Sequence, residues 1–495
     1  MTAAKGGGIT FLGALFEYAG RFVFGIVVAR FIGAEQYGVY TLALTPLNIL
    51  VVLAQLGLRE SMTRYVPIFA RQRDEERLWG TLQVGLGLTA IASIVLGGGL
   101  FVLADSVANR MFHTPELAPF LRIAGFVIPF TAMIDIIVPA TRGFMQMQYK
   151  VYAQDISLTL IKLVLAVILL AMGFGTLGVM VAYVVATISA FFMLLYFLHS
   201  LFPLNRPLAA ARRSTKQILS LSLPVYLSHV IGILEGNLQV LLLGMLNTAT
   251  AVGIFAAAAR VSFVGNLFHR SILNVSPPIV SDLYSKGDQD QLKRFYQVVS
   301  KWTFTLNFPL FLIITIFSER ILSIFGNSFV VGSTALVILA FGFLTTAGTG
   351  ICGVIINMTG RTWLSMINSI CVLLLAVTLN ILLVPGLGAI GAAIAATVTT
   401  AVLNLARLLE VFVLFRLLPY DKDFIKPILA GLTAMVVTFV ITHWVFTGTS
   451  LIYTVLSATF LLVTYITMIL LLGLSEEDQL VLKRLHSRLK AALQY

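Results

Sequence analysis

Charged residues are scarce in this sequence. They make up 11% of the 495 residues, whereas hydrophobic residues make up 59%, and the mean hydropathy is +0.97. A soluble globular domain carries roughly 25% charged residues, so the composition excludes a soluble protein. Because a membrane-spanning helix uses about 20 apolar residues, the sequence predicts an all-α polytopic membrane protein.

Cysteine and catalytic motifs are also nearly absent. The two cysteines, Cys352 and Cys371, lie in apolar stretches, which excludes a disulfide framework and a thiol metal site. Two G-x-G-x-x-G strings, at 173–178 and 386–391, lie in short turns between apolar helices, so they do not indicate nucleotide binding. We therefore expect no enzyme, no metal and no organic cofactor.

Acidic residues are outnumbered by basic ones. The chain has 33 Lys and Arg against 21 Asp and Glu, for a net charge of +12. On a soluble protein this excess would suggest nucleic acid as a partner. In a membrane protein it indicates basic cytoplasmic loops, so we expect no nucleic-acid partner.

Fourteen apolar windows, from 8–30 to 451–473, predict fourteen transmembrane helices. Most Lys and Arg lie in the two terminal segments or after even-numbered windows, and only Arg30, Arg110 and Arg320 follow odd-numbered windows. Since short cytoplasmic loops collect Lys and Arg, we expect a multi-pass protein of the cytoplasmic membrane with both termini in the cytoplasm.

An internal repeat divides these windows into two halves. At offsets of 213 and 215 residues, 173–178 matches 386–391 and 37–40 matches 252–255. Because the offset covers six spans, the halves form a parallel repeat, which predicts two six-helix lobes facing a central cavity. The predicted domains are an N-lobe at 1–205, a cytoplasmic linker at 206–216, a C-lobe at 217–416, a further helix pair at 417–474 and an amphipathic cytoplasmic tail at 475–495.

Charges inside the spans point to a site, because each one needs a partner or a wet cavity. Glu17 and Arg21 on the first span are four residues apart, so they either neutralise each other or leave Arg21 facing the cavity. The eighth span carries Arg260, Arg270 and Asn274. Arg270 either contacts a ligand or snorkels to the interface, and the same alternatives hold for Arg59 and Arg64 at the inner end of the second span.

Guanidinium groups suit phosphate, because their planar fork donates two parallel hydrogen bonds. A cationic cavity therefore favours an anionic, phosphate-bearing solute over a drug cation. Glu235 on the seventh span lies near the position equivalent to Arg21. It either binds a coupling Na⁺ or H⁺, or pairs with an arginine such as Arg260.

Several segments carry a resemblance to a known family. Residues 29–40, ARFIGAEQYGVY, resemble the A-R-x-x-G-x-x-x-Y-G-x-Y signature of polysaccharide flippases in the multidrug, oligosaccharidyl-lipid and polysaccharide superfamily. Residues 57–64 resemble the end of their second helix. The strings SLP at 222–224, VGIF at 252–255 and GAIGAA at 388–393 resemble their second lobe, so the match spans about residues 8 to 416.

The resemblance implies a V-shaped pair of lobes that moves a polyprenyl-diphosphate-linked oligosaccharide to the outer leaflet by alternating access. Arg21, Arg260 and Arg270 match the cationic cavity positions of such flippases. Some relatives bind sodium through helices 7, 11 and 12, for which the nearest equivalents are Glu235, Asn380 and Thr397. Relatives often carry Asp slightly later on helix 7, where this chain has Asn237 and Gln239.

The expected partners are a lipid-linked anionic oligosaccharide, membrane lipids, and glycan polymerases or transferases. Two rivals are weaker. A cation-coupled multidrug exporter is disfavoured by the positive cavity and the extra helix pair. A glycan ligase or polymerase needs a sizeable outer loop, and the largest predicted here is about 105–119.

Overall fold

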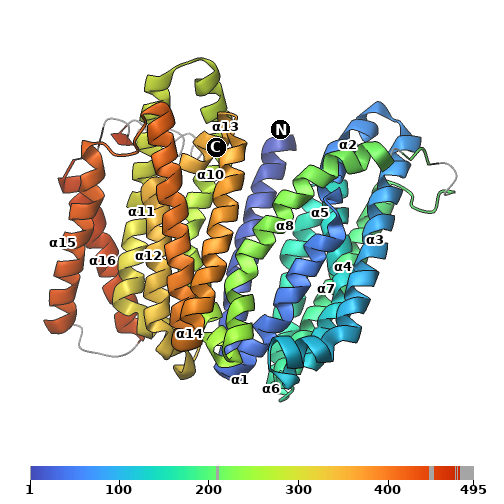
Figure 1. The fold of residues 1–495 in the computed structure, drawn as a ribbon, viewed down its shortest axis with the longest axis horizontal. Helices are drawn as coiled ribbons and strands as arrows, with labels where there is room; N and C mark the ends of the chain where they lie inside the picture. The colour runs from blue at the N-terminus through green and yellow to red at the C-terminus, as the bar shows by residue number, and fades with distance from the viewer. Residues whose placement is uncertain are drawn as a thin grey trace, which may run out of the picture. The chain divides into compact units, whose positions relative to one another are not determined.

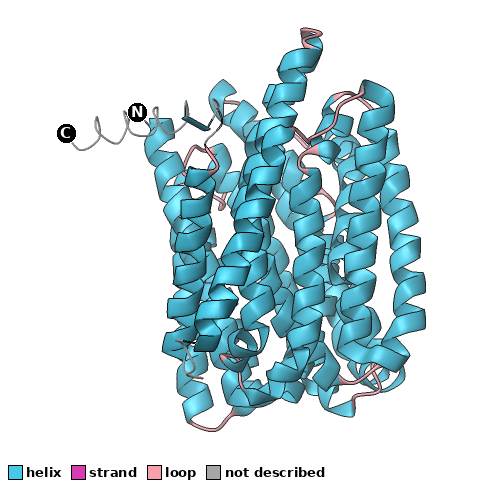
Figure 2. Ribbon diagram, turned by 90° about the vertical axis from the view of Figure 1, so that its left-hand side faces the viewer, coloured by secondary structure: helices cyan, strands magenta, loops and turns pink. Residues whose placement is uncertain are grey.

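Long apolar runs can satisfy their backbone hydrogen bonds in a membrane only as helices or closed barrels. The computed structural model describes residues 2–207, 211–213, 215–444, 451–473, 475, 478 and 479, and contains helices and turns but no strand among them (Figure 2). The prediction of an all-helical membrane protein is therefore confirmed.

The described chain forms two compact units. Unit 1 comprises residues 1–257 and 324–329, and unit 2 comprises 258–323 and 330–495 (Figure 1). The helices of unit 1 are α1 (Thr2–Gln55), α2 (Leu58–Gln72), α3 (Glu75–Ser106), the π-helix η1 (Val107–Met111), the 3₁₀ helix η2 (Pro115–Leu117), α4 (Ala118–Gly143), α5 (Gln148–Lys150), the π-helix η3 (Val151–Leu158), α6 (Thr159–Ala171), α7 (Gly175–Leu201), α8 (Thr215–Leu246) and the first part of α9 (Ala249–Ser262).

Unit 2 begins in the last turn and a half of α9. Its remaining elements are the 3₁₀ turn η5 (Phe263–Gly265), α10 (Asn266–Ser285), α11 (Gln289–Ser323), the end of the 3₁₀ helix η6 (Asn327–Gly332), α12 (Ser333–Thr349), α13 (Cys352–Met358), α14 (Thr362–Phe415), the 3₁₀ helix η7 (Lys422–Phe424), α15 (Ile425–Trp444) and α16 (Leu451–Leu471). Helices α15 and α16 pack against each other and against α11.

The number of spans differs from the sequence prediction. The described residues contain 11 helices that are long and apolar enough to cross a membrane, or up to 12 if one bent pair is a single span, so the predicted fourteen is not confirmed. Two of these helices, α1 and α14, are 54 residues each and break at Gly33 and Gly388, whose positive φ values suit glycine. Each is about twice the length that one crossing requires.

The repeated sequence reappears as a close helix contact within unit 1. A Cβ added to Gly38 on α1 would lie 1.7 Å from the carbonyl oxygen of Ala249, and one added to Gly253 on α9 would lie 1.9 Å from that of Ala34. Both the Ala pair and the Gly pair are 215 residues apart. Two small-x-x-x-small pairs from matching places in the repeat thus let the helix backbones touch.

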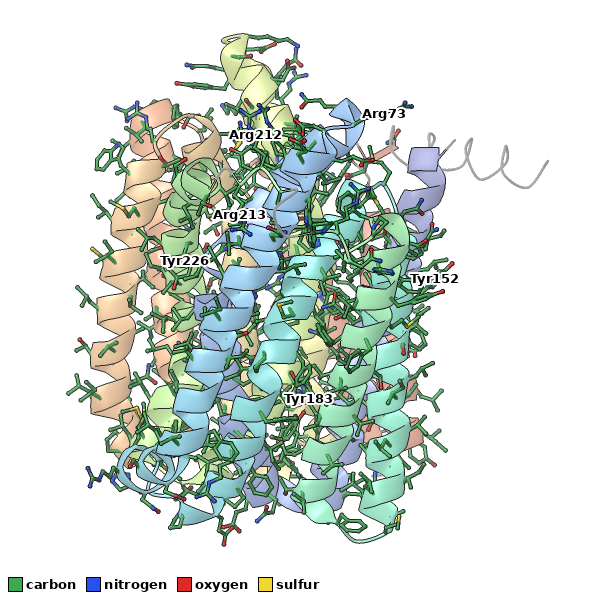
Figure 3. The ribbon with its side chains drawn as sticks, turned by 90° about the vertical axis from the view of Figure 1, so that its right-hand side faces the viewer. Arg73, Tyr152, Tyr183, Arg212, Arg213 and Tyr226 are labelled. Carbon is green, nitrogen blue, oxygen red and sulfur yellow. The ribbon has the colours of Figure 1, made fainter. Side chains whose placement is uncertain are left out.

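The basic segment after α7 lies along the start of α3. Trp79 Nε1 donates a hydrogen bond to Pro207 O (3.1 Å), and Arg213 Nε donates one to Gln83 Oε1 (2.9 Å). Arg212, Arg213 and the α2–α3 turn residue Arg73 lie toward the same end of unit 1 (Figure 3). Helix α8 then packs on α1 and α2, so unit 1 extends past the predicted linker, while the predicted domain boundaries remain predictions.

Three described residues of the predicted tail, 475, 478 and 479, follow α16, and the rest of the tail lies outside the described residues. Asp478 accepts hydrogen bonds from Trp302 Nε1 (2.6 Å) and Lys301 Nζ (3.1 Å), and Lys301 also donates to Ser475 Oγ (2.7 Å). Burial alone would raise the pKa of Asp478, but the hydrogen bonds from Trp302, Ser475 and Lys301 lower it overall. The start of the tail is thereby tied to α11.

Candidate functional site

The ion pair predicted on the first span is present in unit 1. Arg21 Nη2 lies 2.5 Å from Glu17 Oε1. The Arg21 side chain is nevertheless 60% exposed, whereas that of Glu17 is 13% exposed. The pair therefore neutralises Glu17 inside the unit and still leaves most of the arginine accessible to an anionic ligand.

Glu17 belongs to a larger charge cluster that sequence reasoning missed. Lys150 Nζ lies 3.5 Å from Glu17 Oε2 and also pairs with the fully buried carboxylate of Asp155 in η3. A Cβ on Gly13 would lie 2.8 Å from Asp155 Oδ2, so this glycine lets α1 approach η3 closely. Asp155 was detectable as an acidic residue in an apolar run, which is a functional signal by default.

Two predicted arginines of unit 1 gather near a further carboxylate. Gln55 Nε2 donates a hydrogen bond of 2.7 Å to Asp135 Oδ2 on α4, and Arg59 and Arg21 both interact electrostatically with Asp135. Both guanidinium groups therefore act electrostatically on one carboxylate, and neither forms a salt bridge with it in the described part of the chain. Arg64 is exposed on α2, with Cζ 5.8 Å from the centre of the Tyr65 ring.

The predicted eighth span is not one straight helix. It is broken at η5, and α9 with η5 is bent by 50° from the helix that follows. Faces inferred at a uniform 100° per residue therefore do not carry across from Arg260 to Arg270, because a 3₁₀ turn has 3.0 residues per turn. Arg260 lies half-buried in the last turn of α9, and Arg270 and Asn274 are exposed on α10.

The residues predicted to bind a coupling ion lie in both units, and each is described in its own. Glu235 is half-buried on α8 in unit 1. In unit 2, Asn380 and Thr397 lie on the two arms of α14, on either side of Gly388. Asn380 is fully buried, and its Oδ1 accepts no hydrogen bond from the described residues. Thr397 Oγ1 donates to Ile338 O (2.8 Å).

The arginine side chains described above are suited to binding an anionic ligand. Among the described residues, no group of three or more His, Cys, Asp or Glu side chains is placed to hold a metal ion. Each unit instead carries arginine guanidinium groups on its membrane-spanning helices. Such groups bind phosphate or carboxylate by bidentate, charge-assisted hydrogen bonds.

Comparisons with known proteins agree with this chemistry. The sequence model of a family described as "Polysaccharide biosynthesis protein" matches residues 27–334. The probable low-salt glycan biosynthesis flippase Agl15 of Haloferax volcanii is 24% identical over 421 residues, which cover 80% of this chain and 78% of that protein.

Two solved structures share the fold. The lipid II flippase MurJ in an inward closed conformation has a TM-score of 0.73 at 15% identity, covering 92% of this chain and 97% of that one. An inward-facing multidrug resistance MATE family transporter of the MOP superfamily has a TM-score of 0.65 at 17% identity, covering 81% of this chain and 94% of that one. At these identities the likeness concerns the fold alone.

Proposed function

This chain belongs to the polysaccharide biosynthesis protein family, and from that premise we propose that it is a flippase for a polyprenyl-diphosphate-linked oligosaccharide. It moves the sugar and diphosphate from the inner to the outer leaflet by alternating access. The observation that carries the proposal is the family match together with arginines on membrane-spanning helices. A flippase changes no covalent bond, which agrees with a family of transporters.

The proposed phosphate ligands are arginines of each unit. An arginine in a span is costly unless it meets a counter-charge, a cavity or the interface. A diphosphate supplies the counter-charge when substrate is bound, and Arg21 keeps 60% of its side chain exposed despite its pair with Glu17. The full proposed set is Arg21, Arg59 and Arg64 in unit 1 and Arg260, Arg270 and Asn274 in unit 2.

We also propose the cellular setting. The predominance of Lys and Arg in segments after even-numbered windows supports a cytoplasmic-membrane protein with both termini in the cytoplasm. A glycan carried on lipid is made by transferases and joined by polymerases, so these enzymes are the proposed partners. Agl15 of Haloferax volcanii is named as a glycan biosynthesis flippase, which supports the same class of cargo.

The rival function is export of organic cations, since a MATE transporter shares the fold. Reconstitution of the purified protein in vesicles separates the two. We expect a fluorescent polyprenyl-diphosphate oligosaccharide in the inner leaflet to become accessible to an added glycosidase in vesicles with protein and not in protein-free vesicles. Transport of an ethidium-like cation without transport of the lipid-linked sugar would instead establish the exporter.

The coupling ion is a further proposal, with Glu235 as its ligand and Asn380 and Thr397 as additional candidates. A ligand shifts a conformational equilibrium only through its different affinity for the two states. We therefore expect Glu235→Gln to remove the effect of Na⁺ or of pH on the accessibility of a cysteine reporter, at an unchanged melting temperature.

Glu410→Gln is the matched control for this experiment. Glu410 is another acid on an apolar helix, and Asn368 Nδ2 donates to both of its oxygens at 3.0 Å. That variant should keep the wild-type ion response. If Glu235→Gln responds to the ion as wild type does, Glu235 has no coupling role; if it loses stability, the carboxylate neutralises a buried arginine instead.

A further inference from the structure

The guanidinium of Arg270 lies over an aromatic ring at the break between α9 and α10. Its Cζ is 4.7 Å from the centre of the Phe263 ring, well within the range of a cation–π interaction. Phe263 is the first residue of η5. The contact therefore joins the turn that breaks the span to the arginine proposed as a phosphate ligand.

The contact spans the break between α9 and α10. In a straight α-helix, residues seven positions apart are separated by about 10 Å along the axis. Here the helix is bent by 50° at η5, and long helical side chains point back toward the N-terminus. The Arg270 side chain reaches the ring of Phe263 across this break.

The ring is the more buried partner of this contact, and the arginine is the more exposed one. The η5 turn packs against α11 and α12, and Phe263 is half-buried, whereas Arg270 is exposed. Confining a long arginine side chain costs conformational entropy. A side chain already held over a ring has lost part of that freedom before a ligand arrives, so the ligand binds more tightly.

Stacking also leaves the correct part of the guanidinium available. When an aromatic ring contacts the face of a guanidinium, the N–H donors point outward along its edge. Arg270 forms no salt bridge and donates no hydrogen bond to the residues that the structure describes. Arg21, by contrast, already directs donors at Glu17.

We propose that Phe263 is a positioning residue, which stacks on Arg270 and holds its donor edge ready for the diphosphate of the lipid-linked substrate. This inference rests on the proposed function, because it takes Arg270 as a phosphate ligand. It adds a residue that sequence motifs do not mark, since a phenylalanine in an apolar span is ordinarily a packing residue.

The test measures binding of geranylgeranyl diphosphate, and of geranylgeraniol as the same tail without phosphate, to the full-length purified protein. We expect Phe263→Leu to weaken diphosphate binding by about 3- to 10-fold, and to leave alcohol binding and the melting temperature unchanged. Phe263→Trp should retain wild-type affinity, because indole also offers a π face. Phe415→Leu removes a similar stack, with Arg361 Cζ at 5.5 Å, and should leave diphosphate binding unchanged.

A double-mutant cycle completes the test. In an Arg270→Met background, Phe263→Leu should cause no further loss, because the ring acts through the arginine. Equal losses with and without Arg270, or wild-type affinity in Phe263→Leu, would overturn the positioning role while leaving the flippase proposal intact. If the wild-type protein bound the alcohol as tightly as the diphosphate, the proposed function and this inference would both be wrong.

Discussion

Reversing the charge of Arg270 or Arg260 by substitution with Glu should abolish glycan export without preventing membrane insertion. Two like charges about 4 Å apart repel by about 4 kcal/mol at an effective dielectric constant of about 20. Each reversal replaces an attraction of similar size with this repulsion, so substrate affinity should fall by more than about 1000-fold. Export would be measured by complementation in a strain that lacks the native gene, with the amount of membrane-inserted protein measured in parallel.

Arg407→Gln supplies a control for an arginine outside the proposed site. Arg407 lies on α14 beside Gly353, and its Nη1 is 3.3 Å from the position of an added Cβ there. We expect this variant to lose some stability and to retain export. Full activity of both Arg260→Glu and Arg270→Glu at normal protein levels would eliminate a cationic substrate site in unit 2.

The second large effect is a loss of stability, expected when a single methyl group is added by replacing glycine with alanine. Gly38→Ala or Gly253→Ala places a methyl group within 2 Å of a carbonyl oxygen of the neighbouring helix, and these oxygens belong to helix backbone that cannot rotate away. Overpacking of a close-packed site typically costs about 1 to 3 kcal/mol. We therefore expect each variant to lower the melting temperature of the purified protein by several degrees.

Replacing glycine with alanine should have the opposite effect on stability where an added Cβ meets no neighbouring atom. A Cβ on Gly232 of α8 or on Gly98 of α3 meets nothing within 4 Å, and alanine is favoured over glycine in a helix by about 1 kcal/mol. Gly232→Ala and Gly98→Ala should leave stability equal or slightly higher. The double variant of Gly38 and Gly253 should destabilise less than the two single changes added together, because both relieve the same contact. Wild-type stability in Gly38→Ala would show that the helices do not touch there.

Some features of this protein could be predicted because they depend on short stretches of sequence. The length of apolar runs predicts membrane helices, which the structure contains. The orientation inferred from the placement of Lys and Arg stays a prediction. The Glu17–Arg21 pair is also local, since residues four apart lie on one face of a helix, and the structure places their charged atoms 2.5 Å apart. The repeat at offset 215 was visible because small residues recur at matching positions.

Other features depend on which helices meet, and windows along the chain do not contain that information. From the sequence, Lys150 is expected to be a charged loop residue. Packing of η3 against α1 instead places it between Glu17 and Asp155. The break at η5 cannot be predicted from hydropathy, because a hydropathy window averages over the three residues of the 3₁₀ turn. Only the fold shows that Phe263 lies beneath Arg270.

The sequence by itself thus determined the all-helical membrane class of the molecule and the residue types of its proposed site, but not the number of its spans. Tertiary structure decided which charges are paired, where the eighth span bends, and that the repeated pairs at Ala34 and Gly38 and at Ala249 and Gly253 lie against one another. The physical reason is one of range. Hydrophobic burial and helix formation act over a few turns of one segment, whereas the Lys150–Glu17 pair and the backbone contact at Gly38 and Gly253 require segments more than 100 residues apart to meet.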